Sequence, residues 1–215
     1  DDNGNLIDTA QITQVAVPGT TFYVLIAFNG LCTDTDTINI TVNPLPSADA
    51  GADQEMIVLS STTIGGSPAT TGGNTVIWQP SMYLNDSTLF NPQLTPDTTG
   101  TYTYVLNVTD PNGCQNSDTV VITVLPSIGF PNGFSPNGDG TNDVWEIDYI
   151  SLFPDAQVEV YNRWGQLLFL SVGYQTPWDG TYNNQPVPVG TYYYIINLNH
   201  PLYPDAFTGP LTVLR

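Results

Sequence analysis

The stretch Gly100-Thr-Tyr-Thr-Tyr-Val-Leu-Asn-Val108 is followed by a turn, Asp110-Pro-Asn-Gly113, and then by Asp118-Thr-Val-Val-Ile-Thr-Val124. The two outer runs are rich in the β-branched and aromatic residues that pack well on a pleated sheet. The turn between them holds the proline, asparagine and glycine that are typical of tight connections. We therefore predict an antiparallel hairpin.

The same pattern occurs a second time, nearer the N-terminus. Thr20-Thr-Phe-Tyr-Val-Leu-Ile-Ala-Phe28 precedes a turn at Asn29-Gly30 and the run Thr35-Asp-Thr-Ile-Asn-Ile-Thr-Val42. Tyr23 in the first copy and Tyr104 in the second are 81 residues apart, which is the length of one immunoglobulin-like sandwich. No stretch carries apolar residues at helical spacing. The sequence thus predicts an all-β chain of tandem immunoglobulin-like β-sandwich domains, the first truncated.

Prolines mark the ends of the two copies, at Asn43-Pro-Leu-Pro46 and Leu125-Pro126. We interpret these segments as linkers and predict three domains. Residues 1–46 are the C-terminal part of a truncated repeat, residues 47–126 a complete repeat, and residues 127–215 a third sandwich. Because the first copy lacks the strands that should cover its sheet, we expect it to be the least stable part of the chain.

The third domain has its own pattern of strands and does not repeat the first two. Short β-type runs alternate with clusters of Asn, Gly and Pro, as in a small sandwich. The strands are predicted at residues 143–149, 156–161, 167–172, 188–197 and 207–214.

The charge of the chain is strongly one-sided. Lys and Arg together number 2, Asp and Glu together 20, and the formal net charge is −18. Nucleic acids and anionic lipids are bound through clustered basic residues, so we predict neither as a partner. The excess of acid favours solubility outside the cell, local cation binding, or both. No apolar run of about 18 residues exists, so we predict no membrane span.

Cys32 and Cys114 occupy equivalent places in the two copies, 82 residues apart. Since equivalent places in tandem domains lie a whole domain apart, we expect the two thiols not to meet. Neither lies at a spacing typical of metal ligands. We predict structural or unpaired thiols.

The segment Ser135-Pro-Asn-Gly-Asp-Gly-Thr-Asn-Asp-Val-Trp-Glu146 has nearly the spacing of a twelve-residue calcium loop. It departs from that pattern in its first residue, a serine, and in the strand rather than helix predicted after it. The alternative is a turn in which Gly138 and Gly140 adopt positive φ and Asx side chains cap their own backbone. Calcium is therefore the candidate cofactor, with candidate ligands at Asn137, Asp139, Thr141, Asp143 and Glu146.

Catalytic chemistry has little support in the sequence. His200 is the single histidine, and no nucleophile in a recognisable turn accompanies it. We therefore predict a surface histidine and no enzyme. Trp78 lies on a predicted central strand, where core packing is favoured over stacking on a sugar.

The two basic residues are candidate contacts for a protein partner. In Asn162-Arg-Trp-Gly165, Arg163 either pairs with an acid or stacks on an aromatic ring in a turn, or it contacts a partner together with Trp164. Arg215 ends the last predicted strand, where an exposed edge or the terminus could pair with a strand of another protein. The partner-binding candidates are thus Arg163, Trp164 and Arg215.

The second domain resembles the PKD-like and immunoglobulin-like modules found in tandem in long bacterial surface proteins. The resemblance is carried by Ala48-Asp-Ala-Gly-Ala-Asp-Gln54, Val76-Ile-Trp-Gln-Pro80, Leu84-Asn-Asp86, Gly100-Thr-Tyr-Thr-Tyr104 and Asn112-Gly-Cys114.

The third domain resembles the gliding-motility-associated C-terminal domain, the type B sorting domain of the type IX secretion system. Five motifs carry the resemblance, in order: Phe134-Ser-Pro-Asn-Gly-Asp-Gly-Thr-Asn-Asp143, Tyr161-Asn-Arg-Trp-Gly165, Trp178-Asp-Gly180, Pro188-Val-Gly-Thr-Tyr-Tyr-Tyr194 and Gly209-Pro-Leu-Thr-Val-Leu-Arg215. The resemblance implies an export signal that is itself a folded domain. Its expected partners are the type IX translocon and a PorP/SprF-like outer-membrane β-barrel protein.

The order of repeat, repeat and sorting domain is similar to the end of an SprB-like gliding adhesin. It implies a secreted protein of the cell surface, associated with the outer membrane, whose repeats bind a surface ligand such as a polysaccharide. The alternative is a set of accessory β-sandwich modules with the sorting tail of a secreted hydrolase. Sequons like those O-glycosylated on exported proteins of such bacteria occur at Thr9, Thr37, Ser87, Thr98 and Thr119.

Overall fold

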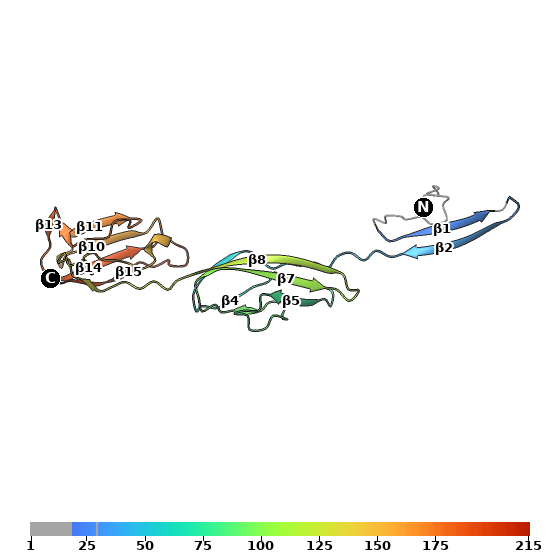
Figure 1. Ribbon diagram of the computed structural model, residues 1–215, viewed down its shortest axis with the longest axis horizontal. Coiled ribbons are helices and arrows are strands. Elements are labelled where there is room, and N and C mark those ends of the chain that lie inside the picture. The colour runs from blue at the N-terminus through green and yellow to red at the C-terminus, as the bar shows by residue number, and fades with distance from the viewer. Residues whose placement is uncertain (1–18, 29) are drawn as a thin grey trace. The chain divides into compact units, whose positions relative to one another are not determined.

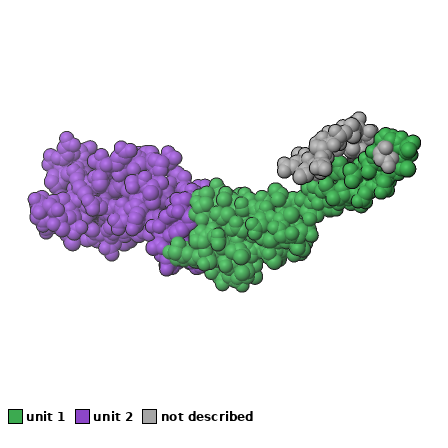
Figure 2. Space-filling view, turned by 45° about the vertical axis from the view of Figure 1, so that its right-hand side comes forward, with its two compact units in different colours: residues 1–53, 62–94, 103–121 green, residues 54–61, 95–102, 122–215 purple. Residues whose placement is uncertain are grey.

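The computed structural model describes residues 19–28 and 30–215, and nearly all the regular structure of this part is β-strand (Figure 1). Its one helical element is a single 3₁₀ turn, η1 (Ile150–Leu152). The prediction of an all-β chain is therefore confirmed. By its internal contacts the chain divides into two compact units, residues 1–53, 62–94 and 103–121, and residues 54–61, 95–102 and 122–215 (Figure 2).

The N-terminal hairpin belongs to the first unit. It consists of β1 (Thr21–Phe28) and β2 (Thr33–Ile40), paired antiparallel from Thr21 opposite Ile40 to Phe28 opposite Thr33. Asn29 of the predicted turn lies outside the described residues. Apolar side chains of β1, among them Leu25 and Phe28, are exposed among the described residues.

The predicted second domain, residues 47–126, is built on a four-stranded sheet with the order β3-β8-β7-β5. β5 pairs antiparallel with β7, whereas β3 pairs in parallel with the end of β8. A second, two-stranded sheet joins β4 and β6. The strands are β3 (Gln54–Ile57), β4 (Thr62–Thr63), β5 (Thr75–Gln79), β6 (Gln93–Leu94), β7 (Gly100–Thr109) and β8 (Gln115–Leu125).

Strict alternation along β7 decides which face of this sheet is buried. Tyr104, Leu106 and Val108 are fully buried, and the residues between them are partly exposed, as expected for a strand with one face on a core. Trp78 of β5 is also buried, and its Nε1 donates a hydrogen bond to the Leu89 carbonyl at 3.1 Å. Trp78 therefore belongs to the core, and the preference for packing over sugar stacking is confirmed.

The C-terminal region, in the second unit, contains a five-stranded sheet with the order β11-β10-β14-β15-β9. All its pairings are antiparallel except that of β15 with β9. A separate small hairpin joins β12 and β13. The strands are β9 (Gly133–Phe134), β10 (Gln157–Tyr161), β11 (Leu167–Val172), β12 (Thr181–Tyr182), β13 (Gln185–Pro186), β14 (Gly190–Asn197) and β15 (Phe207–Val213).

The strand predicted at residues 143–149 is wrong. Only an isolated bridge forms there, between Trp145 and Trp178, and Tyr149 adopts a left-handed conformation (φ 61°) just before η1. Trp145 and Ile147 are both buried, so the alternation of apolar and polar residues in the sequence does correspond to alternating burial. It arises because two side chains anchor an irregular segment to the core, not because the backbone joins a sheet.

Three aromatic residues connect this irregular segment to the core. The Tyr174 hydroxyl donates a hydrogen bond to the Trp145 carbonyl at 2.6 Å and accepts one from the Trp178 backbone N–H at 3.1 Å. The Trp145 N–H donates in turn to the Trp178 carbonyl at 2.8 Å. Burial raises the pKa of Tyr174 well above its ordinary value, so the hydroxyl stays protonated and keeps its donor role.

Replacing Tyr174 by Phe should lower the free energy of unfolding by about 1–3 kcal/mol, because a buried carbonyl and a buried N–H each lose their partner while the ring is kept. The measurement is urea unfolding of the whole chain followed by tryptophan fluorescence. Tyr193→Phe is the matched control, because Tyr193 is half exposed, and it should leave the midpoint unchanged. Equal midpoints for both variants would contradict the role given to the Tyr174 hydroxyl.

Candidate functional site

The Asp143 loop, residues 135–143, is closed by a single carboxylate. Asp143 Oδ1 accepts hydrogen bonds from the backbone N–H groups of Asn137 at 3.0 Å and Gly138 at 2.6 Å, and Oδ2 accepts one from Gly140 at 2.7 Å. Backbone hydrogen bonds, those of Gly138 and Gly140 foremost, hold the pKa of Asp143 below its ordinary value of 3.8. This one carboxylate therefore holds three backbone N–H groups of the loop together.

The two glycines of the loop make this arrangement possible. Gly138 and Gly140 have φ values of 80° and 87°, a region that residues with a Cβ rarely adopt. Successive N–H groups then converge on one point and form an anion-binding concavity. The predicted positive-φ turn is therefore confirmed, and the anion that fills it comes from the chain itself.

The carboxylate of Asp139, another predicted ligand, also accepts hydrogen bonds within the loop. Its Oδ1 accepts a hydrogen bond from the Thr141 N–H and its Oδ2 accepts one from Asn137 Nδ2, both at 2.8 Å. Glu146 is exposed, and within the described residues no hydrogen bond joins its carboxylate to the loop. Four of the five predicted ligands therefore meet in one turn, and Glu146 does not join them.

The oxygen atoms of the predicted ligands do not fit a cation in this arrangement. The Asp143 oxygens face N–H groups, which repel a metal ion, and no group of three or more His, Cys, Asp or Glu residues in the described part of the chain is placed to hold one. Calcium binding stays a prediction of the sequence.

A groove of about 320 Å³ lies on the C-terminal region. None of its lining residues is an Asp or a Glu, although the chain has 20 of them. The lining consists of amide, aromatic and apolar residues, one threonine and one arginine: Asn162, Arg163, Trp164, Gln166, Leu168, Tyr182, Gln185, Pro186, Val187, Pro188, Val189, Gly190, Thr191 and Tyr192.

The turn after β10 supplies the charged part of the groove. Asn162 Oδ1 accepts the backbone N–H groups of Trp164 and Gln166, both at 3.0 Å, and so fixes the turn from within. Arg163 and Trp164 are displayed at its tip. The Arg163 Cζ lies 4.9 Å from the centroid of the Trp164 ring, a cation–π contact, and Trp164 is 79% exposed. Of the interpretations open for Arg163, stacking on an aromatic ring is the one observed.

Arg215 lies near the same groove. Its Nη1 donates a hydrogen bond to the carbonyl of Val187, a lining residue, at 2.7 Å. Burial raises the pKa of Tyr192, and the charges of Arg215 and Arg163 both oppose that rise. Both guanidinium groups therefore lie within electrostatic reach of one phenol, and the groove gathers the two basic residues of the chain.

One interpretation of Arg215 needs correction. The edge of the last strand, β15, is occupied next to Arg215, because β9 pairs with it at Thr212 and Val213; capture at the terminus stays a prediction. The three predicted partner-binding residues nevertheless gather around one groove. Sequence reasoning missed the residues that connect them, Val187 and Tyr192, since only the long-range packing of residues 185–192 places these beside the Arg163 turn.

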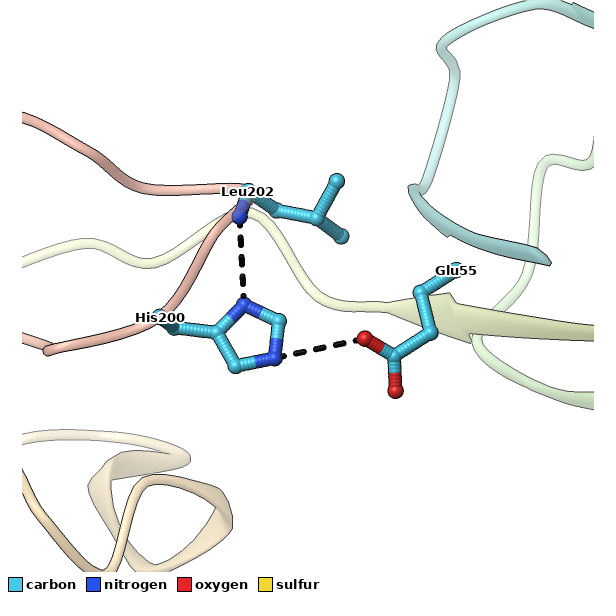
Figure 3. A network of polar contacts seen from close by, with 3 residues as sticks. All are labelled: Glu55, His200 and Leu202. Atoms are coloured by element: carbon cyan, nitrogen blue, oxygen red, sulfur yellow. Dashed lines mark hydrogen bonds and ion pairs between the residues drawn. The ribbon is translucent and has the colours of Figure 1, made fainter.

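His200 takes part in a polar contact with Glu55 and with the backbone of Leu202. Its Nδ1 accepts a hydrogen bond from the Leu202 N–H at 3.3 Å, and its Nε2 lies 3.4 Å from Glu55 Oε2. Figure 3 draws both contacts. Its side chain is 22% exposed. Within the described residues no Ser, Thr or Cys side chain is hydrogen-bonded to it.

The remaining predicted positions lie on the surface or outside the described part. Thr37, Thr98 and Thr119 are exposed, and Ser87 is half-buried. Thr9 lies outside the described residues. Cys32 and Cys114 are not joined to each other, as expected.

Comparison with known families assigns the C-terminal region. Residues 128–212 match the family model described as the CHU_C type IX secretion signal domain. This region is therefore a type IX secretion signal domain, and it implies export to the cell surface or the medium. No curated protein matches the chain. Among residues 19–28 and 30–215 no helix has the length and hydropathy needed to cross a bilayer.

Several solved structures resemble the chain at low identity. A PKD domain from the KIAA 1837 protein is 24% identical, with a TM-score of 0.34, over 41% of this chain and 95% of that one. The titin I-band fragment I67–I69 is 13% identical, with a TM-score of 0.43, over 90% and 74%. The DIP-gamma IG1+IG2 structure is 12% identical, with a TM-score of 0.41, over 79% and 97%.

Replacing Asp143 by Asn should lower the thermal unfolding midpoint at pH 7, because an amide cannot accept all three backbone N–H groups. Since the folded pKa lies below 3.8, the carboxylate stabilises the fold above that pH, and its contribution disappears as the pH falls through the lowered value. The difference between wild type and variant should therefore vanish in strong acid. Asp148→Asn, an exposed position, is the control, and a difference that persists in acid would contradict the role given to the Asp143 carboxylate.

The same assay tests the calcium prediction. A bound ion should raise the unfolding midpoint of the wild type with calcium concentration and leave that of Asp139→Ala unchanged. Isothermal titration of the wild type with calcium chloride gives the direct readout, and the absence of heat would refute the prediction.

Proposed function

We propose that this chain is the C-terminal part of a large secreted cell-surface adhesin whose last domain is its type IX export and anchoring signal. The observation that carries the proposal is the match of residues 128–212 to the secretion signal domain. Repeats of β-sandwich type precede this domain, and such modules suit a stalk that holds a binding surface away from the cell.

The signal acts as a folded domain, not as a linear peptide. All 17 buried residues of its core lie between Phe134 and Val213, so nearly all the apolar side chains that stabilise it come from the matched region itself. A recognition partner therefore meets a shaped surface assembled from distant segments. This suits the type IX translocon and a PorP/SprF-like outer-membrane β-barrel as partners, because both would receive cargo that has already folded.

We infer a non-catalytic role for the repeats and for the C-terminal domain alike. His200 contacts a glutamate and a backbone N–H, and in the described part of the chain it has no hydroxyl or thiol to activate. Trp78 is buried in the core and offers no face to a sugar. A surface ligand of the adhesin, such as a polysaccharide, would then be bound by other parts of the protein or by the outer faces of the repeats.

Fusing residues 127–215 to an inert exported carrier should place the carrier on the cell surface of a bacterium with a type IX system. The measurement is antibody labelling of intact cells, compared with labelling after lysis. The matched control is the same carrier fused to residues 47–126, a β-module of similar size, which should stay inside. Surface labelling that is equal for both fusions, or absent for both, would contradict the proposed sorting role.

A further inference from the structure

The distribution of charge singles out the groove around Arg163. The chain carries 20 acidic residues and two basic ones. Arg163 lines this groove, and Arg215 donates a hydrogen bond to the carbonyl of a lining residue, Val187. An acidic partner is repelled by a surface of net charge −18 except where positive charge is concentrated. The groove, with no acidic residue in its lining, is the place where such a partner can approach.

The arginine side chains have hydrogen-bonding capacity to spare. A guanidinium group has five N–H donors. Arg215 uses Nη1 on the Val187 carbonyl, and Arg163 stacks on Trp164. Across residues 19–28 and 30–215, neither arginine pairs with a carboxylate. A carboxylate from outside can therefore be bound in the two-pronged geometry that arginine favours.

Three polar side chains of the groove wall, Asn162, Gln166 and Tyr192, already form hydrogen bonds within the protein. The Asn162 side chain caps its own turn and donates to Gln166 Oε1 at 3.0 Å, and Gln166 Nε2 donates to the Tyr182 hydroxyl at 3.3 Å. The Tyr192 hydroxyl donates to the Pro188 carbonyl at 2.7 Å. A sugar needs many unoccupied donors and acceptors, whereas this groove offers positive charge and exposed apolar surface. These properties favour a peptide over a glycan.

An edge strand begins at the groove. β11 lies at the end of the five-stranded sheet and, among the strands that the structure describes, pairs only with β10. Its residue Leu168 lines the groove. Leu170 and Val172 further along are exposed. An edge strand of this kind presents backbone N–H and C=O groups that an extended segment of another chain can pair with.

We propose that the groove and the edge of β11 together dock an extended segment of a protein partner that carries a carboxylate side chain. Arg163 binds the carboxylate, Trp164 covers apolar atoms beside it, and β11 pairs with the backbone of the segment. The inference goes one step beyond the proposed function, because it names the chemistry that the sorting domain recognises. It rests on the proposed function only for the place where the partner is found.

The test uses the whole chain and two fluorescent peptide probes of eight alternating Thr and Val residues, one with a central Asp and one with Asn in its place. Fluorescence polarisation at low salt should show the Asp probe binding about tenfold or more tightly than the Asn probe, because a hydrogen bond between two charged groups is stronger than one to a neutral amide. Arg163→Gln should remove that preference, and Trp164→Ala should weaken both probes.

Ser81→Asp is the matched control, since it lowers the net charge by the same one unit as Arg163→Gln, at an exposed position outside the groove lining. It should leave the affinity within about twofold of wild type. Equal affinity for the two probes, an equal loss in Ser81→Asp, or displacement of the Asp probe by a polyuronate but not by excess unlabelled peptide would each overturn the proposal.

Export of the carrier fusion separates this inference from the proposed function. The comparison uses the wild-type tail and the double variant that carries both Arg163→Gln and Trp164→Ala. If the two direct export equally well, the groove is not the recognition surface and the sorting role stands. If the wild-type tail directs no export, the sorting role fails, whatever the peptide probes show.

Discussion

The C-terminal domain depends on the buried hydrogen bonds that join Trp145, Tyr174 and Trp178. These residues come from irregular segments, and the Tyr174 hydroxyl links the backbones of the two tryptophans. The Asp143 loop ends just before Trp145, and the segment that forms one wall of the groove starts shortly after Trp178. Gly180 shows how closely these parts pack, because a Cβ there would lie 3.0 Å from Pro136 Cγ. Loop and groove are therefore positioned by the same core.

Much of the fold can be predicted because its strands carry their signal locally. The hairpin of β7 and β8, strand β11 and the buried Trp78 all follow from alternation, turn residues or β-branched content. The segment at 143–149 is misassigned from sequence, since burial by side-chain anchoring produces the same alternation as a strand. β9 has two residues and pairs in parallel with a strand about 80 residues away along the chain, so no local pattern reveals it.

The candidate site is predictable in part. Arg163 and Trp164 can be singled out because basic residues are so rare here, and the glycines of the Asp143 loop indicate a turn. The role of Asp143 does not follow from the sequence, because spacing alone does not tell whether a carboxylate faces a cation or backbone N–H groups. The groove itself depends on Val187 and Tyr192, whose position beside Arg163 is set by packing between distant segments.

An acidic chain that gathers its two arginines in one groove of a folded secretion signal domain is suited to recognition by shape and charge together. The most direct test is export of the carrier fused to residues 127–215 with Trp178→Ala, a substitution of a buried residue that should cost about 3–5 kcal/mol of stability. Surface labelling of intact cells should fall together with the loss of folded structure. Undiminished labelling from an unfolded tail would contradict recognition of the signal as a folded domain.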